Sequence, residues 1–137
     1  MEKRYTYEEL LKLIAELRSD HGCPWDRAQT HESMIKCLQE ESEEVIQAIE
    51  KKDDENLCEE LGDVLLQVLM HSQIAAEEQR FTIEDVVDML AQKLVRRHPH
   101  VFGDVKALTP EEGLASWQAV KQKEKEARAA NKMQEKP

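Results

Sequence analysis

The fold is decided by residues 38–69, which read LQEESEEVIQAIEKKDDENLCEELGDVLLQVL. In the first half Leu38, Val45 and Ile49 recur at the spacing of one helix face, and the second half is apolar over a wider face. A short polar turn, Lys-Asp-Asp, separates the halves. So short a connection predicts an antiparallel helical hairpin.

Helix signals continue on both sides of this hairpin. Thr6 and Glu9 have the spacing of a capping box, and Pro99 ends a further apolar helix. Thr109 followed by Pro110 is a strong helix start. The sequence therefore predicts an all-α bundle of four to five helices without strands. The expected helices cover residues 6–19, 31–52, about 55–79, about 82–97 and a last stretch from residue 109, with a loop over residues 20–26.

The composition is suited to one helical domain. Of 137 residues, 40% are hydrophobic but only 4% are aromatic, with four glycines and four prolines. Strands draw on aromatic and β-branched residues and need turn residues between them, so this balance favours helices. A chain of this length can bury a core. We expect one domain over residues 1–126 and a frayed, charged tail over residues 127–137.

The charge limits the partners. At a formal net charge of -10, the chain is repelled by the phosphates of nucleic acid and by anionic membrane surfaces. We therefore expect no nucleic-acid polymer and no membrane as a partner. A phosphate-bearing small molecule remains compatible, provided that a cation bridges the charges.

The three cysteines indicate a reducing compartment. Their number is odd and no C-x-x-C is present, and the start of the sequence is amphipathic rather than continuously apolar, so we expect no secretory signal. We predict a cytoplasmic protein without disulfides. Cys37 and Cys58 are expected to be buried small hydrophobic residues.

Acidic residues stand where core residues are expected. Glu41 falls on the apolar stripe of the first hairpin helix, and Glu44 follows one turn later. Glu60 and Asp63 are also three apart, so each pair projects from one side of its helix. Burying a carboxylate in an apolar interface costs several kcal/mol of folding free energy, unless the carboxylate is paired with a cation or binds a metal. Acidic pairs alone are typical of solvated faces, but two pairs on facing helices predict a site for Mg²⁺ or Mn²⁺.

A basic group ends the helix at residue 97. Lys93 and Arg97 are four apart and share a face. Their spacing alone favours a helix end that complements the macrodipole, and the alternative is a clamp for phosphate oxygens, which includes Arg96. Trp25 and Trp117, the two tryptophans, are by residue type more often core anchors than stacking platforms.

Several short runs of the sequence together match the motifs of one protein family. The runs GCPWD and RRHPHVFGD are the most specific of these motifs. The two acidic runs and the run that begins at Trp117 stand at suitable separations from them. From about Leu10 to Lys125 the chain resembles MazG-type nucleoside triphosphate pyrophosphohydrolases, and in particular the N-terminal copy of their two-domain members. The matching runs are residues 22–26 (GCPWD), 40–44 (EESEE), 59–63 (EELGD), 96–104 (RRHPHVFGD) and 117–121 (WQAVK).

This resemblance implies a function. Members hydrolyse nucleoside triphosphates (NTP or dNTP) between the α and β phosphates, giving monophosphate and pyrophosphate, with a house-cleaning role against noncanonical nucleotides. It also implies Mg²⁺, with Mn²⁺ as a substitute, and a bundle built by paired chains, hence a homodimer or a dimer of dimers.

The resemblance also assigns roles to residues. The metal ligands are Glu41, Glu44, Glu60 and Asp63. Glu40 is a residue that supports these ligands or orients water, and the five residues together make up the catalytic set. The substrate-binding set is Lys93, Arg96, Arg97, Trp117 and Trp25.

The sequence also bears on two other functions. A di-iron carboxylate bundle needs Glu-x-x-His on two helices, and no histidine in this sequence has a glutamate three positions before it. A non-catalytic helical module that binds nucleotides or a protein through the same bundle stays open, because nothing in the sequence excludes it.

Overall fold

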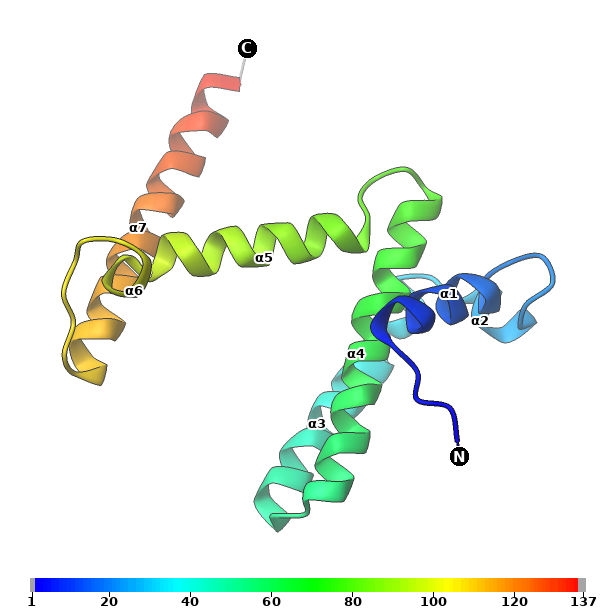
Figure 1. Ribbon diagram of the computed structural model, residues 1–137. Coiled ribbons are helices and arrows are strands. Elements are labelled where there is room, and N and C mark those ends of the chain that lie inside the picture. Colours follow the sequence, from blue (N-terminus) through cyan, green and yellow to red (C-terminus); the bar gives the residue numbers. More distant parts are fainter. Residues whose placement is uncertain (1, 136–137) are drawn as a thin grey trace. The chain divides into compact units, whose positions relative to one another are not determined.

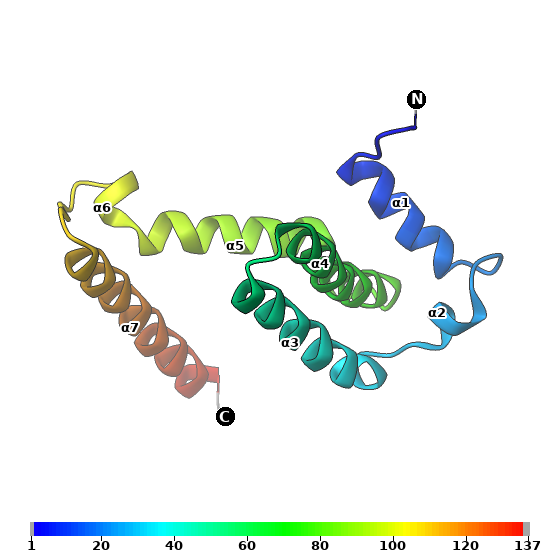
Figure 2. The same ribbon diagram turned by 90° about the horizontal axis from the view of Figure 1, so that it is seen from below.

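The hairpin is present as predicted. In the computed structural model, which describes residues 2–135, α3 (Ile35–Lys51) and α4 (Asp54–Glu77) are antiparallel and pack against each other. They lie side by side in both views (Figures 1 and 2). Lys52 turns the chain with a left-handed backbone, φ 55°, and Asp53 caps α4 by accepting a hydrogen bond from Asn56 N at 3.2 Å.

Shorter elements precede the hairpin, and they include α1 (Tyr7–Leu17), α2 (Pro24–Ala28) and the 3₁₀ turn η1 (Glu32–Met34). The Thr6 capping box is confirmed, since Glu9 N donates to Thr6 Oγ1 at 3.2 Å and Thr6 N donates to Glu9 Oε1 at 3.1 Å. The expected loop is wrong in part. Pro24 opens the short helix α2, because a proline without an N–H is suited to a first helical position.

The buried core lies at one end of the hairpin, where α1 meets α4. Its members are at most 4% exposed. The other half of the hairpin, toward the turn, is covered only along the seam between its two helices, where Ala48 is fully buried. The core cluster consists of Ile14, Met34, Leu69, Met70 and Ile74.

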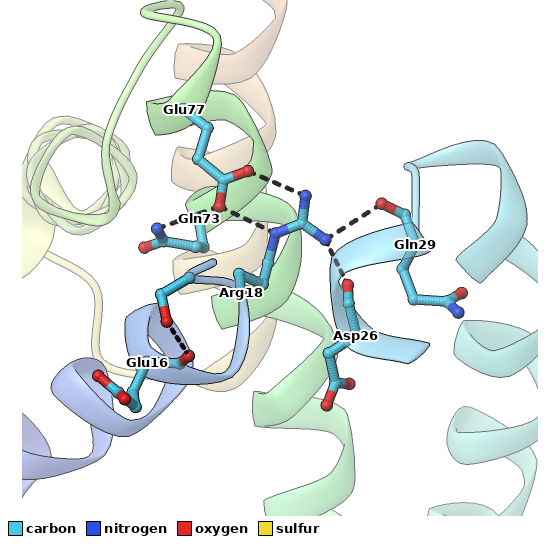
Figure 3. Close-up of polar contacts among 7 residues, drawn as sticks. Glu16, Arg18, Asp26, Gln29, Gln73 and Glu77 are labelled. Atoms are coloured by element: carbon cyan, nitrogen blue, oxygen red, sulfur yellow. Dashed lines mark hydrogen bonds and ion pairs between the residues drawn. The ribbon is translucent and has the colours of Figure 1, made fainter. Parts of the chain in front are cut away.

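Arg18 joins three segments at this core (Figure 3). Its Nε and Nη2 donate to the two carboxylate oxygens of Glu77 on α4, each at 2.9 Å. Its Nη1 donates to the carbonyls of Asp26 at 2.6 Å and Gln29 at 3.1 Å. The Arg18 side chain is only 8% exposed. A planar guanidinium can make these bonds in several directions at once, which a lysine cannot.

The turn after α1 depends on a glycine. A Cβ placed on Gly22 would overlap the carbonyl oxygens of Glu16 and Leu17. Because backbone atoms cannot move aside without opening the end of α1, any larger residue disturbs the segment that leads to α2.

The second compact unit begins after Ile83. It contains most of α5 (Ile83–Arg97), then α6 (Pro99–Phe102) and α7 (Pro110–Glu135), and α6 packs on α7. Thr109 Oγ1 accepts a hydrogen bond from Glu112 N at 3.2 Å, as expected of a cap. The single turn α6 was not predicted. The stretch from residue 127 is helical as far as Glu135, and a single domain that ends at residue 126 stays a prediction.

The helices add up to an all-α fold, and no strand occurs among residues 2–135. Among residues 2–135, no helix has both the length and the apolar character that a membrane span requires.

We predict that Arg18→Met lowers the free energy of unfolding by about 2–4 kcal/mol, because it leaves Glu77 and two carbonyls without their donor. Urea denaturation measures this loss. Arg27→Met is the control, since its ion pair with Asp20 is long, at 3.5 Å, and exposed, and we expect a change below about 1 kcal/mol. Equal losses in the two variants would contradict the clamp.

The same pair predicts a pH dependence. Arg18 holds the pKa of Glu77 below its usual value, chiefly by hydrogen bonding. This contribution to stability is present above the pKa of the unfolded carboxyl and is lost as the pH falls through the lower folded pKa. The part of the acid sensitivity that comes from Glu77 should be absent in Arg18→Met.

Candidate metal centre

Four carboxylates converge in the seam of the hairpin. Glu41 and Glu44 come from α3, and Glu60 and Asp63 come from α4. One oxygen from each side chain can be chosen so that all four lie within 4.8 Å of one another. The spacing of three residues in each pair produces this arrangement, because both side chains of a pair project from the same side of a helix.

The proximity of these carboxylates raises the pKa values of Glu41 and Glu60. The pKa of Glu60 is raised to about 7, first by its hydrogen bond with Glu44, then by burial and by the neighbouring charges. Burial raises the pKa of Glu41, and the charges of Glu44 and Asp63 add to this effect. Without a counter-charge, the seam therefore favours a partly protonated cluster.

The cluster is suited to a hard cation. Oxygens Oε2 of Glu41 and of Glu60 are buried, and neither has a hydrogen-bond partner within the described residues. No ion pair of residues 2–135 includes a member of the cluster. An all-oxygen donor set without histidine or cysteine fits Mg²⁺ or Mn²⁺. The role of the four carboxylates as ligands remains a prediction.

Glu40 lies outside this group. It is exposed on α3, and its nearest ionic contact is Lys36 Nζ, at 3.9 Å. Among residues 2–135 it has no hydrogen bond or ion pair with the four carboxylates, and its only recorded effect on them is that its charge helps to raise the pKa of Glu41. The assignment of Glu40 to the catalytic set stays a prediction.

The predicted substrate-binding residues meet in part within the second unit. The guanidinium of Arg97 lies over the ring of Trp117, 5.9 Å from its centroid, and Lys121 Nζ lies 4.9 Å from the same centroid. Arg96 and Arg97 share a carboxylate, Glu124. Lys93 is half-buried on α5, and its side chain has no hydrogen bond or ion pair with any of residues 2–135.

Glu124 and Lys121 were missed by the sequence reasoning. The signal was available, because Trp117, Lys121 and Glu124 stand at positions i, i+4 and i+7 and so share one face of α7. The helical spacing within α7 does not reveal that this face pairs with Arg96 and Arg97 on α5.

Some expectations about burial are wrong. Trp25 is 75% exposed on α2, so it is not a core anchor. Cys37 and Cys58 are exposed, not buried, and together with Cys23 they are free thiols. Cys37 and Cys58 lie on the hairpin helices, on faces that the other described residues of the first compact unit leave exposed.

The fold and the site define a class of protein: an all-α domain with a carboxylate cluster in a helical hairpin. Residues 29–102 match the MazG nucleotide pyrophosphohydrolase domain. The chain belongs to this MazG family.

Known proteins resemble the chain over most of its length. It is 50% identical over 129 residues to the nucleoside triphosphate pyrophosphohydrolase/pyrophosphatase MazG of Thermotoga maritima, covering 94% of this chain and 49% of that protein. The nucleoside triphosphate pyrophosphohydrolase of Escherichia coli (strain K12) is 42% identical, over 89% of this chain and 47% of that protein. The chain thus spans about half the length of these relatives.

A solved structure is also similar. The crystal structure of a MazG-related protein from Thermotoga maritima superposes with a TM-score of 0.68 at 32% identity, covering 84% of this chain and 98% of that one.

We predict that Asp63→Asn raises the melting temperature of the metal-free protein by about 3–6 °C, because it removes one of four converging charges. The same variant should lose most of the stabilisation that wild type gains from added Mg²⁺. Differential scanning calorimetry with and without chelator measures both. Glu43→Gln, at an exposed position of α3, is the control and should respond to Mg²⁺ as wild type does.

The Mg²⁺ effect should also depend on pH. Since the pKa of Glu60 is raised to about 7, the charge penalty in the metal-free protein is relieved below the unfolded pKa and is full above about pH 7. We therefore expect a larger Mg²⁺-induced rise in melting temperature at pH 8 than at pH 5. A rise of the same size at both would contradict the cluster as the binding site.

Proposed function

We propose that the chain is a Mg²⁺-dependent enzyme that hydrolyses NTPs or dNTPs, noncanonical nucleotides among them, to the monophosphate and pyrophosphate. The observation that carries this proposal is the four-carboxylate cluster with its two unpartnered oxygens. Membership of the MazG family supports the reaction type.

The carboxylates of the hairpin would hold the cation, Glu41 and Glu44 from α3 and Glu60 and Asp63 from α4. A bound Mg²⁺ supplies charge neutralisation of the triphosphate and polarisation of the α-phosphoryl group. It also explains how a chain with a net charge of -10 accepts a polyanion.

The chain's own residues then order the reaction. A water molecule, oriented by a carboxylate such as Glu40 or a cluster member, attacks the α-phosphorus and gives up its proton to that carboxylate. The bond from this phosphorus to the α–β bridging oxygen breaks, and pyrophosphate leaves with the electron pair. Lys93, Arg96 and Arg97 donate to the phosphate oxygens and stabilise the charge that develops on the leaving group. Trp117, and by resemblance Trp25, contact the nucleotide.

Product analysis tests the reaction. We expect a panel of NTPs and dNTPs with Mg²⁺ to give monophosphate and pyrophosphate, chelation to abolish turnover, and Asp63→Asn to lower kcat by at least about 100-fold, because a ligand of the metal is lost. Glu43→Gln should retain the activity of wild type.

Other products overturn parts of the proposal. Orthophosphate with the diphosphate would keep the metal site but refute cleavage between the α and β phosphates. Saturable nucleotide binding without turnover would instead establish the non-catalytic binding module. Full activity in Asp63→Asn would refute the ligand assignment.

We also propose that the chain functions as a homodimer or a dimer of dimers. The outward faces of the hairpin helices expose large apolar side chains, including Ile46 at 46% on α3 and Leu61 at 51% on α4. Gly62, inside α4, has open space where its Cβ would stand. A second copy of the hairpin would cover these apolar side chains. Several of them are exposed on the same two helices, whereas single exposed apolar side chains would need no explanation.

Light scattering tests the assembly. We expect a mass of at least twice 15.9 kDa for wild type, and dissociation in Ile46→Glu, because a charge in an apolar interface is costly. Gln47→Glu adds the same charge one residue further on, at an exposed polar position, and should leave the assembly intact. A wild-type monomer with full activity would refute the proposal.

A further inference from the structure

One carboxylate holds two neighbouring arginines. Arg96 Nε donates to Glu124 Oε2 at 2.7 Å. Arg97 donates to Glu124 Oε1 through Nη2 at 2.9 Å and through Nε at 3.2 Å. The side chains of Arg97 and Glu124 are only 13% and 15% exposed, respectively. This arrangement is more buried than an ordinary surface ion pair, so it is screened less by solvent.

The bonds leave one edge of each guanidinium unused. Glu124 occupies the Nε of both arginines and Nη2 of Arg97. Nη1 and Nη2 of Arg96, and Nη1 of Arg97, have no hydrogen-bond partner among residues 2–135. These terminal groups form the fork with which arginine binds phosphate oxygens. Arg96 is 48% exposed, so its fork is open to a ligand.

An aromatic ring contacts the same group. The guanidinium of Arg97 and the ammonium of Lys121 both lie over the ring of Trp117. Such cation–π contacts fix the plane of the guanidinium. The group therefore carries three cations and one carboxylate, which leaves a local excess of positive charge in a strongly acidic chain.

We propose that Glu124 is a positioning residue for anion binding: it holds the Nε edges of Arg96 and Arg97 so that their terminal nitrogens bind the oxygens of a polyphosphate. The inference rests on the proposed function, in which these arginines bind the triphosphate. Its new element is Glu124, which acts through the two arginines and does not itself contact the substrate.

Simple electrostatics predicts the opposite effect of a substitution. If Glu124 only competed with the phosphate, or only lowered the local charge, Glu124→Gln would strengthen the binding of an anion. A positioning role predicts weaker binding, because the arginines lose the charged acceptor that orders them. The sign of the change in affinity therefore distinguishes the two roles.

The test measures the affinity of the full chain for inorganic tripolyphosphate with Mg²⁺ by calorimetry. We expect Glu124→Gln to raise Kd about tenfold, as for the loss of ordered charge-assisted hydrogen bonds. Glu126→Gln is the matched control, because Glu126 lies on the same helix and, among residues 2–135, its side chain bonds only Gln122 Nε2, at 3.3 Å. It should change Kd by less than about twofold. An unchanged or lower Kd in Glu124→Gln overturns the proposal.

A second measurement observes the arginines directly. In unliganded wild type, the Nε–H groups of Arg96 and Arg97 should give protected ¹⁵N signals, and Glu124→Gln should lose them. If Glu124→Gln does not fold, as judged by circular dichroism, Glu124→Asp keeps the charge at a shorter reach and should weaken binding to an intermediate extent. Wild-type affinity in Glu124→Asp together with unchanged arginine signals also overturns the proposal.

The outcomes separate this inference from the reaction. Wild type that binds tripolyphosphate but releases no pyrophosphate from any nucleotide refutes the proposed function, and weaker binding in Glu124→Gln then still supports the positioning role. Wild type that does not bind tripolyphosphate overturns the role of Glu124 itself.

Discussion

The hairpin holds four carboxylates close together, and their mutual repulsion is the main constraint on this fold. The cluster lies between two fixed points of the hairpin, the turn at Lys52 and Asp53 on one side and the buried core on the other. Because both ends are tied, the helices cannot separate to relieve the repulsion. The remaining responses are protonation, which the raised pKa of Glu60 expresses, and binding of a cation. Either response lowers the repulsion within the hairpin.

The closed end of the hairpin depends on Arg18. Its guanidinium brings the end of α1, the carbonyls after α2 and Glu77 of α4 together, so the core forms where this clamp is. The half of the hairpin that carries the carboxylates has no comparable cover among residues 2–83 of the first compact unit, and large apolar side chains are exposed there. The stabilising contacts of Arg18 and the core therefore lie toward one end of α4, and the carboxylate cluster lies toward the other end. A second copy that covers the open end, as proposed above, would complete the surroundings of the four carboxylates.

Much of the fold could be predicted because its determinants are local. The Thr6 and Thr109 caps, the polar turn and the spacing of three in each acidic pair are all contained within one or two helical turns. The failures concern burial and distant pairing. Cys58 has the sequence surroundings of a core residue, but burial depends on which surfaces cover α4. Glu124 is separated from Arg96 by 28 residues, and no helical period connects them.

The chain uses its arginines in two distinct ways. Arg18 is buried, and both edges of its guanidinium are bonded to the protein, so it has nothing left to offer a ligand. Arg96 is bonded through Nε alone and is half exposed. A functional arginine has to be ordered without being saturated, and a single carboxylate at the Nε edge achieves both. In a protein with so much negative charge, that partial pairing keeps a cationic fork available to a polyanion.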